Sequence, residues 1–269
     1  MSVITISRGT FSGGLMLAEC LGARLGYRII GRDLIVEKAA LSGISQDVLR
    51  DALQKPPSFL ERLKHSKYIY LALIQAALSE EVRSGKVVYH GNAGHLLLRS
   101  APVLRTRIIA PLEFRIKMAQ ERFNLNRAQA LEHIQRMDND RKKWTQYIYG
   151  VDWTDPAIYD IVLNLENMTV PDACDVLAEL VQKDRFALNP ESQAALNDLA
   201  LASRIRANLA MNTSTEDLEV EVLARSGSVT IQGKVSSRYQ CREIERIAKA
   251  VPGVKELSVQ GCAHSSENE

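Results

Sequence analysis

The 269-residue chain has few of the features that mark membrane, secreted or strongly charged proteins. No uninterrupted apolar stretch approaches the roughly 18 to 20 residues that a membrane span needs. The opening, MSVITISRGT, does not place a basic segment before an apolar one, as a secretory signal does. The formal net charge of +2 gives no support to nucleic-acid binding. We therefore expect a cytoplasmic protein that binds no nucleic acid and does not associate with membranes.

The sequence is also poor in cysteine, and its cysteines are widely spaced. Cys20, Cys174, Cys241 and Cys262 do not form the closely spaced pairs that mark zinc or redox sites. No metal site is predicted from them. We expect all of them to be free thiols.

What the chain does contain is an alternation of short apolar strands and helical segments. Strands are predicted at residues 3–6, 87–89, 107–110 and 160–164, and the longest helical segment between them has apolar residues from Leu60 and Leu63 to Leu78. Such alternation predicts an α/β fold with a mostly parallel sheet and helices on both faces. Asn126 is a predicted cap for a long polar helix that ends near Gly150 and projects over the sheet.

The pattern changes after a helix predicted at residues 170–181. The segment KDRFALNPES carries charges, Asn189 and Pro190 but little apolar periodicity, so we place a first domain at 1–185 and a linker at 186–192. Residues 193–262 follow the order helix, strand, strand, helix, strand, which predicts a small αββαβ domain. We expect the tail at 263–269 to be disordered.

The segment SRGTFSGG joins the first strand to the first helix, where backbone N–H groups and the helix dipole favour an anion. A complete phosphate-binding loop reads GxxxxGK[ST]. Here Gly14 occupies the lysine position and Met16 the hydroxyl position, and Arg8 is the candidate substitute cation. A glycine-containing turn without a ligand fits these residues equally well. The candidate phosphate-binding residues are Arg8, Gly9, Thr10, Phe11, Ser12, Gly13, Gly14 and Leu15.

The run ITISRGTFSGGLMLAECLGARLGYRIIGRDLI resembles the opening of the cytidylate kinase-like family of nucleoside monophosphate kinases. The resemblance continues through VVYHGNAGHLLL, VLRTRIIAPLEFRI, DNDRKKW and YGVDWTDPAIYDIVLN, and so covers most of residues 1–183. It implies a P-loop core sheet, a region that binds a monophosphate, and a mobile helical lid whose arginines close on the phosphates. It further implies ATP with Mg²⁺ as the cofactor and Arg141 as the first lid arginine.

The chain departs from this family at several positions. Gly91 stands where an arginine usually binds the monophosphate, Gln146 and Tyr147 stand where the lid typically has more arginine, and Gly31 stands where an acid often occurs. Each missing cation matters, because phosphoryl transfer depends on positioning and charge neutralisation.

Other polar residues are candidates for the monophosphate and base side of the site. Imidazole and amide groups hydrogen-bond neutral polar edges, although loop and helix-cap roles explain these residues equally well. These residues are His90, Asn92 and His95, and Asp33 is a further candidate on this side.

A set of aspartates between 138 and 160 offers a possible catalytic base or Mg²⁺ site. Helix capping and turn formation explain most of them better, and Asp152 is interpreted as an anchor between lid and core. No metal site is predicted.

The segments LASRIRANLA and SGSVTIQGKVSSRYQCREIERIAKAVPGVKELSV resemble the BON domain family over most of residues 193–261. Members of that family often accompany envelopes, transport or ligand sensing, and some contact phospholipid. This copy has no dense basic face, so a regulatory or assembly role is the preferred interpretation. An exposed strand edge in this domain is a candidate surface for a protein partner or a second copy of the chain.

The leading hypothesis from the sequence is a nucleoside monophosphate kinase-like enzyme that transfers the ATP γ-phosphoryl group to CMP or a related pyrimidine monophosphate. The loop from Arg8 to Gly14 would hold the ATP phosphates, and Arg141 would close over the transferred group. The alternative is a catalytically degraded nucleotide-binding sensor that signals through its BON-like domain. An interaction scaffold that binds no nucleotide is a third possibility.

Overall fold

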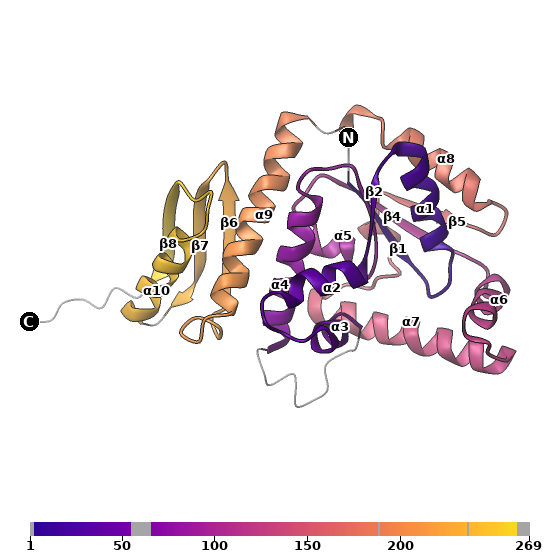
Figure 1. The fold of residues 1–269 in the computed structure, drawn as a ribbon, viewed down its shortest axis with the longest axis horizontal. Coiled ribbons are helices and arrows are strands. Elements are labelled where there is room, and N and C mark those ends of the chain that lie inside the picture. The colour runs from indigo at the N-terminus through magenta and orange to yellow at the C-terminus, as the bar shows by residue number, and fades with distance from the viewer. Residues whose placement is uncertain (1–2, 55–65, 188, 236, 263–269) are drawn as a thin grey trace, which may run out of the picture.

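The computed structural model describes residues 3–54, 66–187, 189–235 and 237–262. These residues form a five-stranded sheet surrounded by helices and a separate three-stranded sheet (Figure 1). The predicted tail at 263–269 lies outside the described residues.

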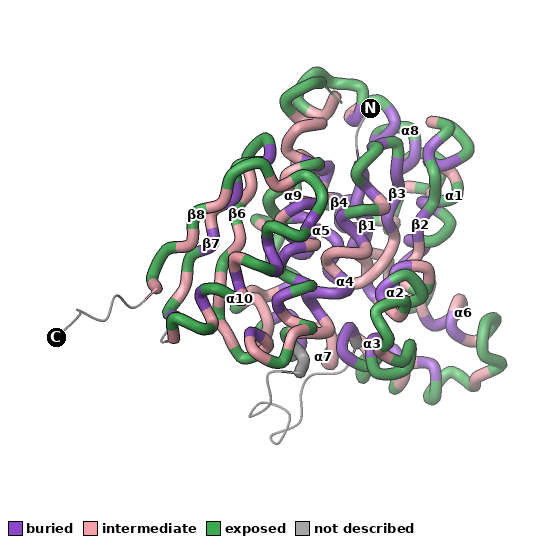
Figure 2. The backbone as a smooth tube through the Cα atoms, turned by 60° about the vertical axis from the view of Figure 1, so that its left-hand side comes forward, coloured by how far each residue is buried: buried purple, intermediate pink, exposed green. Residues whose placement is uncertain are grey.

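The larger sheet has the strand order β2-β3-β1-β4-β5, and all of its neighbouring strands are parallel. Its central strand β1 is buried on both faces from Val3 to Ser7, which explains why it reads as an almost continuous apolar run (Figure 2). The predicted parallel α/β sheet is confirmed. The strands are β1 (Val3–Arg8), β2 (Arg28–Gly31), β3 (Val87–His90), β4 (Val103–Ile109) and β5 (Ile161–Asn164).

Two hydrophobic cores lie on the two faces of this sheet. On one face, Ile4 and Ile6 pack with Leu17 of α1 and Leu177 of α8. On the other face, Val3, Val87 and Tyr89 pack with residues of α2, α3, α4 and α5. The helices are α1 (Gly14–Leu25), α2 (Arg32–Ala40), α3 (Gln46–Gln54), α4 (Ser66–Val82), α5 (Gly94–Leu97), α6 (Leu112–Phe123), α7 (Arg127–Tyr149) and α8 (Val170–Leu180), with short 3-10 turns η2 (Pro156–Ile158) and η3 (Asp184–Phe186). Leu60 and Leu63, which were assigned to the α4 segment, lie outside the described residues.

The polar helix α7 begins and ends where the sequence predicts. Asn126 caps it in a reciprocal arrangement with Gln129, and Gly150 ends it in the left-handed conformation. The helix crosses the lower side of the view in Figure 1. It is not a free projection, because Trp144 is buried in the main core and its Nε1 donates a hydrogen bond to the carbonyl of Ala52 at 2.7 Å. We refer to α7 as the lid helix.

The C-terminal unit has the predicted αββαβ order: α9 (Pro190–Ala210), β6 (Val220–Arg225), β7 (Ser228–Val235), α10 (Arg238–Lys249) and β8 (Glu256–Cys262). Its sheet has the order β6-β7-β8, so β6 and β8 form its edges. Whether either edge pairs with a partner or a second copy stays a prediction.

Helix α9 packs against both parts of the chain, between α4 and the small sheet (Figure 1). Leu196 and Ala207 belong to the core of the large sheet, whereas Ile205 and Leu209 belong to the core of the small one. The two units therefore share a helix as well as a short connection.

The prediction of free thiols is wrong. Cys20 of α1 is bonded to Cys174 of α8, and Cys241 of α10 is bonded to Cys262 of β8. The first pair is 154 residues apart in sequence but its Cα atoms are 6.2 Å apart, because α1 and α8 lie side by side on one face of the sheet. Sequence spacing carries no signal for such a pairing.

None of the described helices is both long and apolar enough to span a bilayer. The cytoplasmic location stays a prediction.

Candidate functional site

The loop at residues 9–13 lies at the carboxyl edge of the large sheet, between β1 and β4. From β1 the chain proceeds toward β2 on one side, and from β4 it proceeds toward β5 on the other. A crevice opens at such a reversal of direction, and ligands of open α/β sheets bind there. Phe11 and Gly13 take positive φ angles of 63° and 78°, and Ser12 N donates to the carbonyl of Gly9 at 3.2 Å, so the chain makes a tight turn into α1.

The side chain of Arg8 lies against Gly14, which occupies the lysine position of the loop. A Cβ atom on Gly14 would overlap with Cδ of Arg8, whose aliphatic stem crosses this position. Burial, followed by the neighbouring Arg141 and Arg32, lowers the pKa of Arg8 to about 10, so its guanidinium stays charged at neutral pH. Leu15 and Met16 are exposed. The stem of Arg8 therefore fills the space beside Gly14, and Arg8 stays the candidate substitute for the missing lysine.

A cavity of about 340 Å³ opens beside this loop. Its walls include the cations Arg107, Arg115 and Lys142 as well as Gly9 and Ser12. The Oγ atom of Ser12 also has no hydrogen-bond partner among the described residues, although only 1% of Ser12 is exposed. Buried hydroxyls are normally paired, so this one is available to hydrogen-bond a ligand that reaches it.

Asp138 of the lid helix connects the loop to the lid. Its Oδ1 accepts hydrogen bonds from Thr10 N at 3.0 Å, from Thr10 Oγ1 at 2.8 Å and from Arg141 Nη1 at 3.1 Å. Its Oδ2 accepts one from Arg115 Nη2. Arg141 Nη1 also donates to the carbonyl of Arg8 at 2.8 Å, and Arg115 Nε donates to that of Thr10 at 2.7 Å. These hydrogen bonds hold α7 against the loop.

Positive charge exceeds negative charge at this site. Arg107 stacks on Trp153, with its Cζ atom 4.3 Å from the ring centroid, and donates to the Trp153 carbonyl. Lys142 pairs with Asp152 at 3.2 Å. The only other carboxylate that contacts these cations within the described residues is that of Asp138, which Arg115 and Arg141 share. A polyanion would complete the neutralisation.

The candidates for the monophosphate side are not gathered in one open cavity. Asp33 is exposed and pairs with Arg32 and Arg50. Asn92 Nδ2 donates to the carbonyl of Leu53 at 3.2 Å, a structural contact. These two residues therefore hold local structure.

The two histidines are neutral. His90 Nδ1 lies 3.5 Å from Arg8 Nη1, and burial followed by Arg8 lowers the pKa of His90 to about 4. His95 is only 3% exposed, its ring stacks 4.6 Å from that of Tyr159, and burial lowers its pKa to about 3. Neither ring nitrogen of His95 has a partner among the described residues.

The cleft that Arg8, Arg141, Asn92 and His95 do border is almost closed, with a volume of about 10 Å³. Tyr89 accounts for the missing family arginine at position 91, because a Cβ atom on Gly91 would overlap with the Tyr89 hydroxyl. Tyr89 is fully buried, and burial raises its pKa. The site therefore has an open cavity beside residues 9–13 and an almost closed cleft next to Arg8 and Arg141.

The sequence named Arg141 for this site, but Asp138, Lys142, Arg107 and Arg115 were not assigned to it. Asp138, Arg141 and Lys142 follow the i, i+3, i+4 spacing of one helix face, and that pattern could have grouped them. Arg107 was visible as a charge inside an apolar strand. Arg115, within α6, carried no distinguishing signal. No group of three or more potential metal ligands occurs among the residues that the structure describes.

Comparison with known proteins agrees with the fold and with both sequence resemblances. Residues 3–167 match the model of the cytidylate kinase-like family, and residues 197–260 match the BON domain. The chain is 27% identical over 185 residues to a cytidylate kinase of Staphylothermus marinus, covering 68% of this chain and 98% of that protein. It is 28% identical over 167 residues to a cytidylate kinase of Ignicoccus hospitalis, covering 61% and 90%.

A solved structure has the same fold. An uncharacterized protein from Eubacterium ventriosum superposes with a TM-score of 0.54 at 18% identity, covering 68% of this chain and 99% of that one. The match extends over nearly all of that protein.

Proposed function

This chain belongs to the cytidylate kinase-like family and carries a BON domain, and on that basis we propose that it binds the polyphosphate of a nucleoside triphosphate in the cavity beside residues 9–13. We further propose that it acts as a sensor, which transmits nucleotide occupancy to the BON domain with little phosphoryl transfer. The observation that carries the proposal is the unpaired, buried Ser12 hydroxyl in a cavity with three cationic side chains, Arg107, Arg115 and Lys142.

The chemistry of this cavity suits phosphate. Guanidinium groups form charge-assisted hydrogen bonds with phosphate oxygens, and the start of α1 adds the positive end of a helix dipole. Ser12, Arg107, Arg115 and Lys142 would hold the phosphates, and Arg8 would supply the charge of the absent lysine. Met16 carries no oxygen ligand, so the position that holds Mg²⁺ in a complete P-loop does not suit a metal ion here.

The part of the site where a monophosphate would bind supports the sensor proposal. Efficient transfer needs both nucleotides held in line, with cations around the transferred group. The cleft between Arg8 and His95 is nearly filled, and Tyr89 blocks an arginine at position 91. Loss of one well-placed transition-state donor typically lowers the rate by about two to three orders of magnitude.

The second candidate function is transfer of the ATP γ-phosphoryl group to CMP, with ATP and Mg²⁺ as cofactor. It is favoured by the position of Arg8 and Arg141, which border the same cleft from β1 and from the lid helix. ATP would supply the phosphoryl group, and Arg141 would bind it as the lid closes. Opening of the lid would enlarge the cleft for the monophosphate.

One experiment separates the two candidates. The purified full-length chain is incubated with ATP, Mg²⁺ and each common monophosphate, and diphosphate formation is measured in parallel with ATP binding. Binding without turnover supports the sensor, and turnover with CMP supports the kinase. Absence of ATP binding overturns both.

Two variants test the site itself. Arg8→Ala is expected to weaken ATP binding at least several-fold. Ser12→Ala is expected to weaken binding without lowering stability, because it removes a hydroxyl that has no partner among the described residues. Arg99→Ala, at an exposed arginine away from the loop, is the matched control. Unchanged ATP affinity in both site variants would remove the cavity from consideration.

A further inference from the structure

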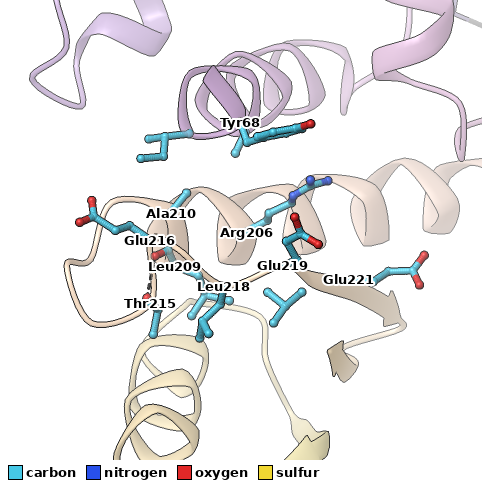
Figure 3. A pocket seen from close by; sticks show the side chains of 12 residues that line it. Tyr68, Arg206, Leu209, Ala210, Thr215, Glu216, Leu218, Glu219 and Glu221 are labelled. Atoms are coloured by element: carbon cyan, nitrogen blue, oxygen red, sulfur yellow. Dashed lines mark hydrogen bonds between the residues drawn. The ribbon is translucent and has the colours of Figure 1, made fainter. Parts of the chain in front are cut away.

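A second cavity, of about 500 Å³, lies where the BON domain meets α4 (Figure 3). Its walls come from the first half of α4, the end of α9, the loop that follows α9 and the start of β6. It shares none of its described lining residues with the cavity beside residues 9–13. Its volume lies within the range of roughly 300 to 1,000 Å³ that is typical of small-molecule sites.

The walls combine an apolar surface with charges of both signs. The apolar lining comes from Ile69 and Ala72 of α4 and from Leu209 and Leu218. Figure 3 shows Arg206 and Glu219 extending from the α9 side toward Tyr68 on α4. Arg206 is exposed and lines the cavity, and it forms no hydrogen bond or ion pair with any other described residue.

The carboxylates determine which ligands are excluded. Glu216, Glu219 and Glu221 all line the cavity, against the one cation Arg206 within the described lining. A polyphosphate would be repelled by these carboxylates, so this is not a second nucleotide site. A simple amine would leave Arg206 unpaired beside its own positive charge. A ligand that carries both an anionic and a cationic group satisfies both sides.

We propose that this cavity binds a small zwitterion with an apolar side chain, of the class of aliphatic and aromatic α-amino acids. The carboxylate of the ligand would pair with Arg206 and its ammonium group with Glu219. The side chain would lie between the apolar surfaces of α4 and α9, formed by Ile69, Ala72 and Leu209. Affinity would come from apolar burial, and selectivity from the two charge pairs.

The site is in contact with the end of the lid helix. Burial raises the pKa of Tyr68. Tyr147, near the end of the lid helix, raises it further and forms a side-chain hydrogen bond with Tyr68. Burial raises the pKa of Tyr149, and the positive charge of Arg206 acts against this by lowering it. The centroid of the Tyr149 ring lies 5.7 Å from that of Trp144. Both tryptophans of the chain, Trp144 and Trp153, lie at or just beyond this end of the lid helix. Ligand binding should therefore change tryptophan fluorescence.

The direct test is titration of the nucleotide-free, full-length protein with L-phenylalanine and L-leucine, followed by calorimetry and by tryptophan fluorescence. Phenethylamine, which lacks the carboxylate, and 3-phenylpropionate, which lacks the ammonium group, are expected to bind roughly tenfold or more weakly, because each loses a charge-assisted interaction. Equal binding of either analogue, or no binding of both amino acids, overturns the proposal.

Variants locate the site. Arg206→Ala and Glu219→Gln are each expected to weaken binding by roughly tenfold or more, while Arg225→Ala, at an exposed arginine on β6, leaves it unchanged. Arg206→Ala should fold normally because it breaks no pairing between described residues, and its unfolding midpoint verifies this. Unaltered affinity in both site variants would place the ligand elsewhere. These titrations contain no ATP, so their outcome does not depend on the proposed nucleotide function. Only an effect of the amino acid on the affinity for ATP would depend on that function.

Discussion

Replacement of Asp138 by asparagine tests the connection between the lid helix and the loop. The carboxylate accepts hydrogen bonds from the backbone and side chain of Thr10, and it is the shared counter-ion of Arg115 and Arg141. Asparagine preserves the size of the side chain and one acceptor oxygen. It removes the negative charge and directs an amide N–H₂ group toward donors.

The size of the effect follows from burial. The side chains of Asp138, Arg115 and Arg141 are 22%, 16% and 14% exposed, so water screens the interaction only in part. Hydrogen bonds to charged groups contribute about 1.5 to 3 kcal/mol each, and removal of one partner from a buried ion pair costs about 3 to 5 kcal/mol. With a discount for partial exposure, Asp138→Asn should lower the free energy of unfolding by about 2 to 4 kcal/mol.

The assay is urea unfolding of the full-length chain, with Asp140→Asn as the matched control. Asp140 lies on the same helix two residues away and forms no hydrogen bond or ion pair with another described residue. A second readout is ATP-induced stabilisation, which should be larger in Asp138→Asn because the phosphate no longer competes with a carboxylate for Arg115 and Arg141. If Asp138→Asn is destabilised by no more than the control, within about 0.5 kcal/mol, the proposed connection is wrong.

Three further predictions follow from buried groups. His95 has a pKa of about 3 in the folded state and 6.5 in the unfolded state, so the unfolded state binds a proton first as the pH falls. The free energy of unfolding should therefore drop by about 3 kcal/mol between pH 6.5 and pH 4. In urea titrations at several pH values, His95→Phe should make this pH dependence weaker. Gly14→Ala should lower the thermal midpoint because its methyl group meets Arg8, and the double variant with Arg8→Ala should recover part of the loss; additive losses would contradict the contact. Reduction of the Cys20–Cys174 bond should destabilise the fold by at most about 5 kcal/mol, which is the chain-entropy limit for a loop of this length. The measurement uses a chain without the Cys241–Cys262 pair. An unchanged urea midpoint would show that the bond adds no stability.

The two cavities have opposite electrostatic character, and this separates their ligands. The cavity beside residues 9–13 is lined by Arg107, Arg115 and Lys142, whereas the cavity beside α4 has more glutamate than arginine. The lid helix reaches both: Asp138 lies at the first cavity, and Tyr147 contacts Tyr68 of the second. Two ligands that bias the same helix affect each other's affinity reciprocally. This arrangement suits the sensor hypothesis.

Local patterns were sufficient to predict much of this protein from its sequence. The apolar run of β1 with its glycine-containing loop, the capping of the lid helix by Asn126 and the αββαβ order near the C-terminus all depend on residues close together in the chain. Backbone propensity, capping and strand periodicity act over that range, so the sequence alone determines them. The family resemblance extended these patterns to the position of Arg141.

Tertiary structure alone decided the details of the site. Asp138 meets Thr10 across 128 residues, Cys20 meets Cys174 across 154, and Arg206 and Tyr68 line a cavity that exists only because α9 packs on α4. These contacts depend on how elements pack, and no local periodicity encodes a contact of that separation. The sequence pattern likewise shows Gly14 only as a missing lysine, because the packing of Arg8 against it is not encoded locally. In the folded protein it is the space that Arg8 fills.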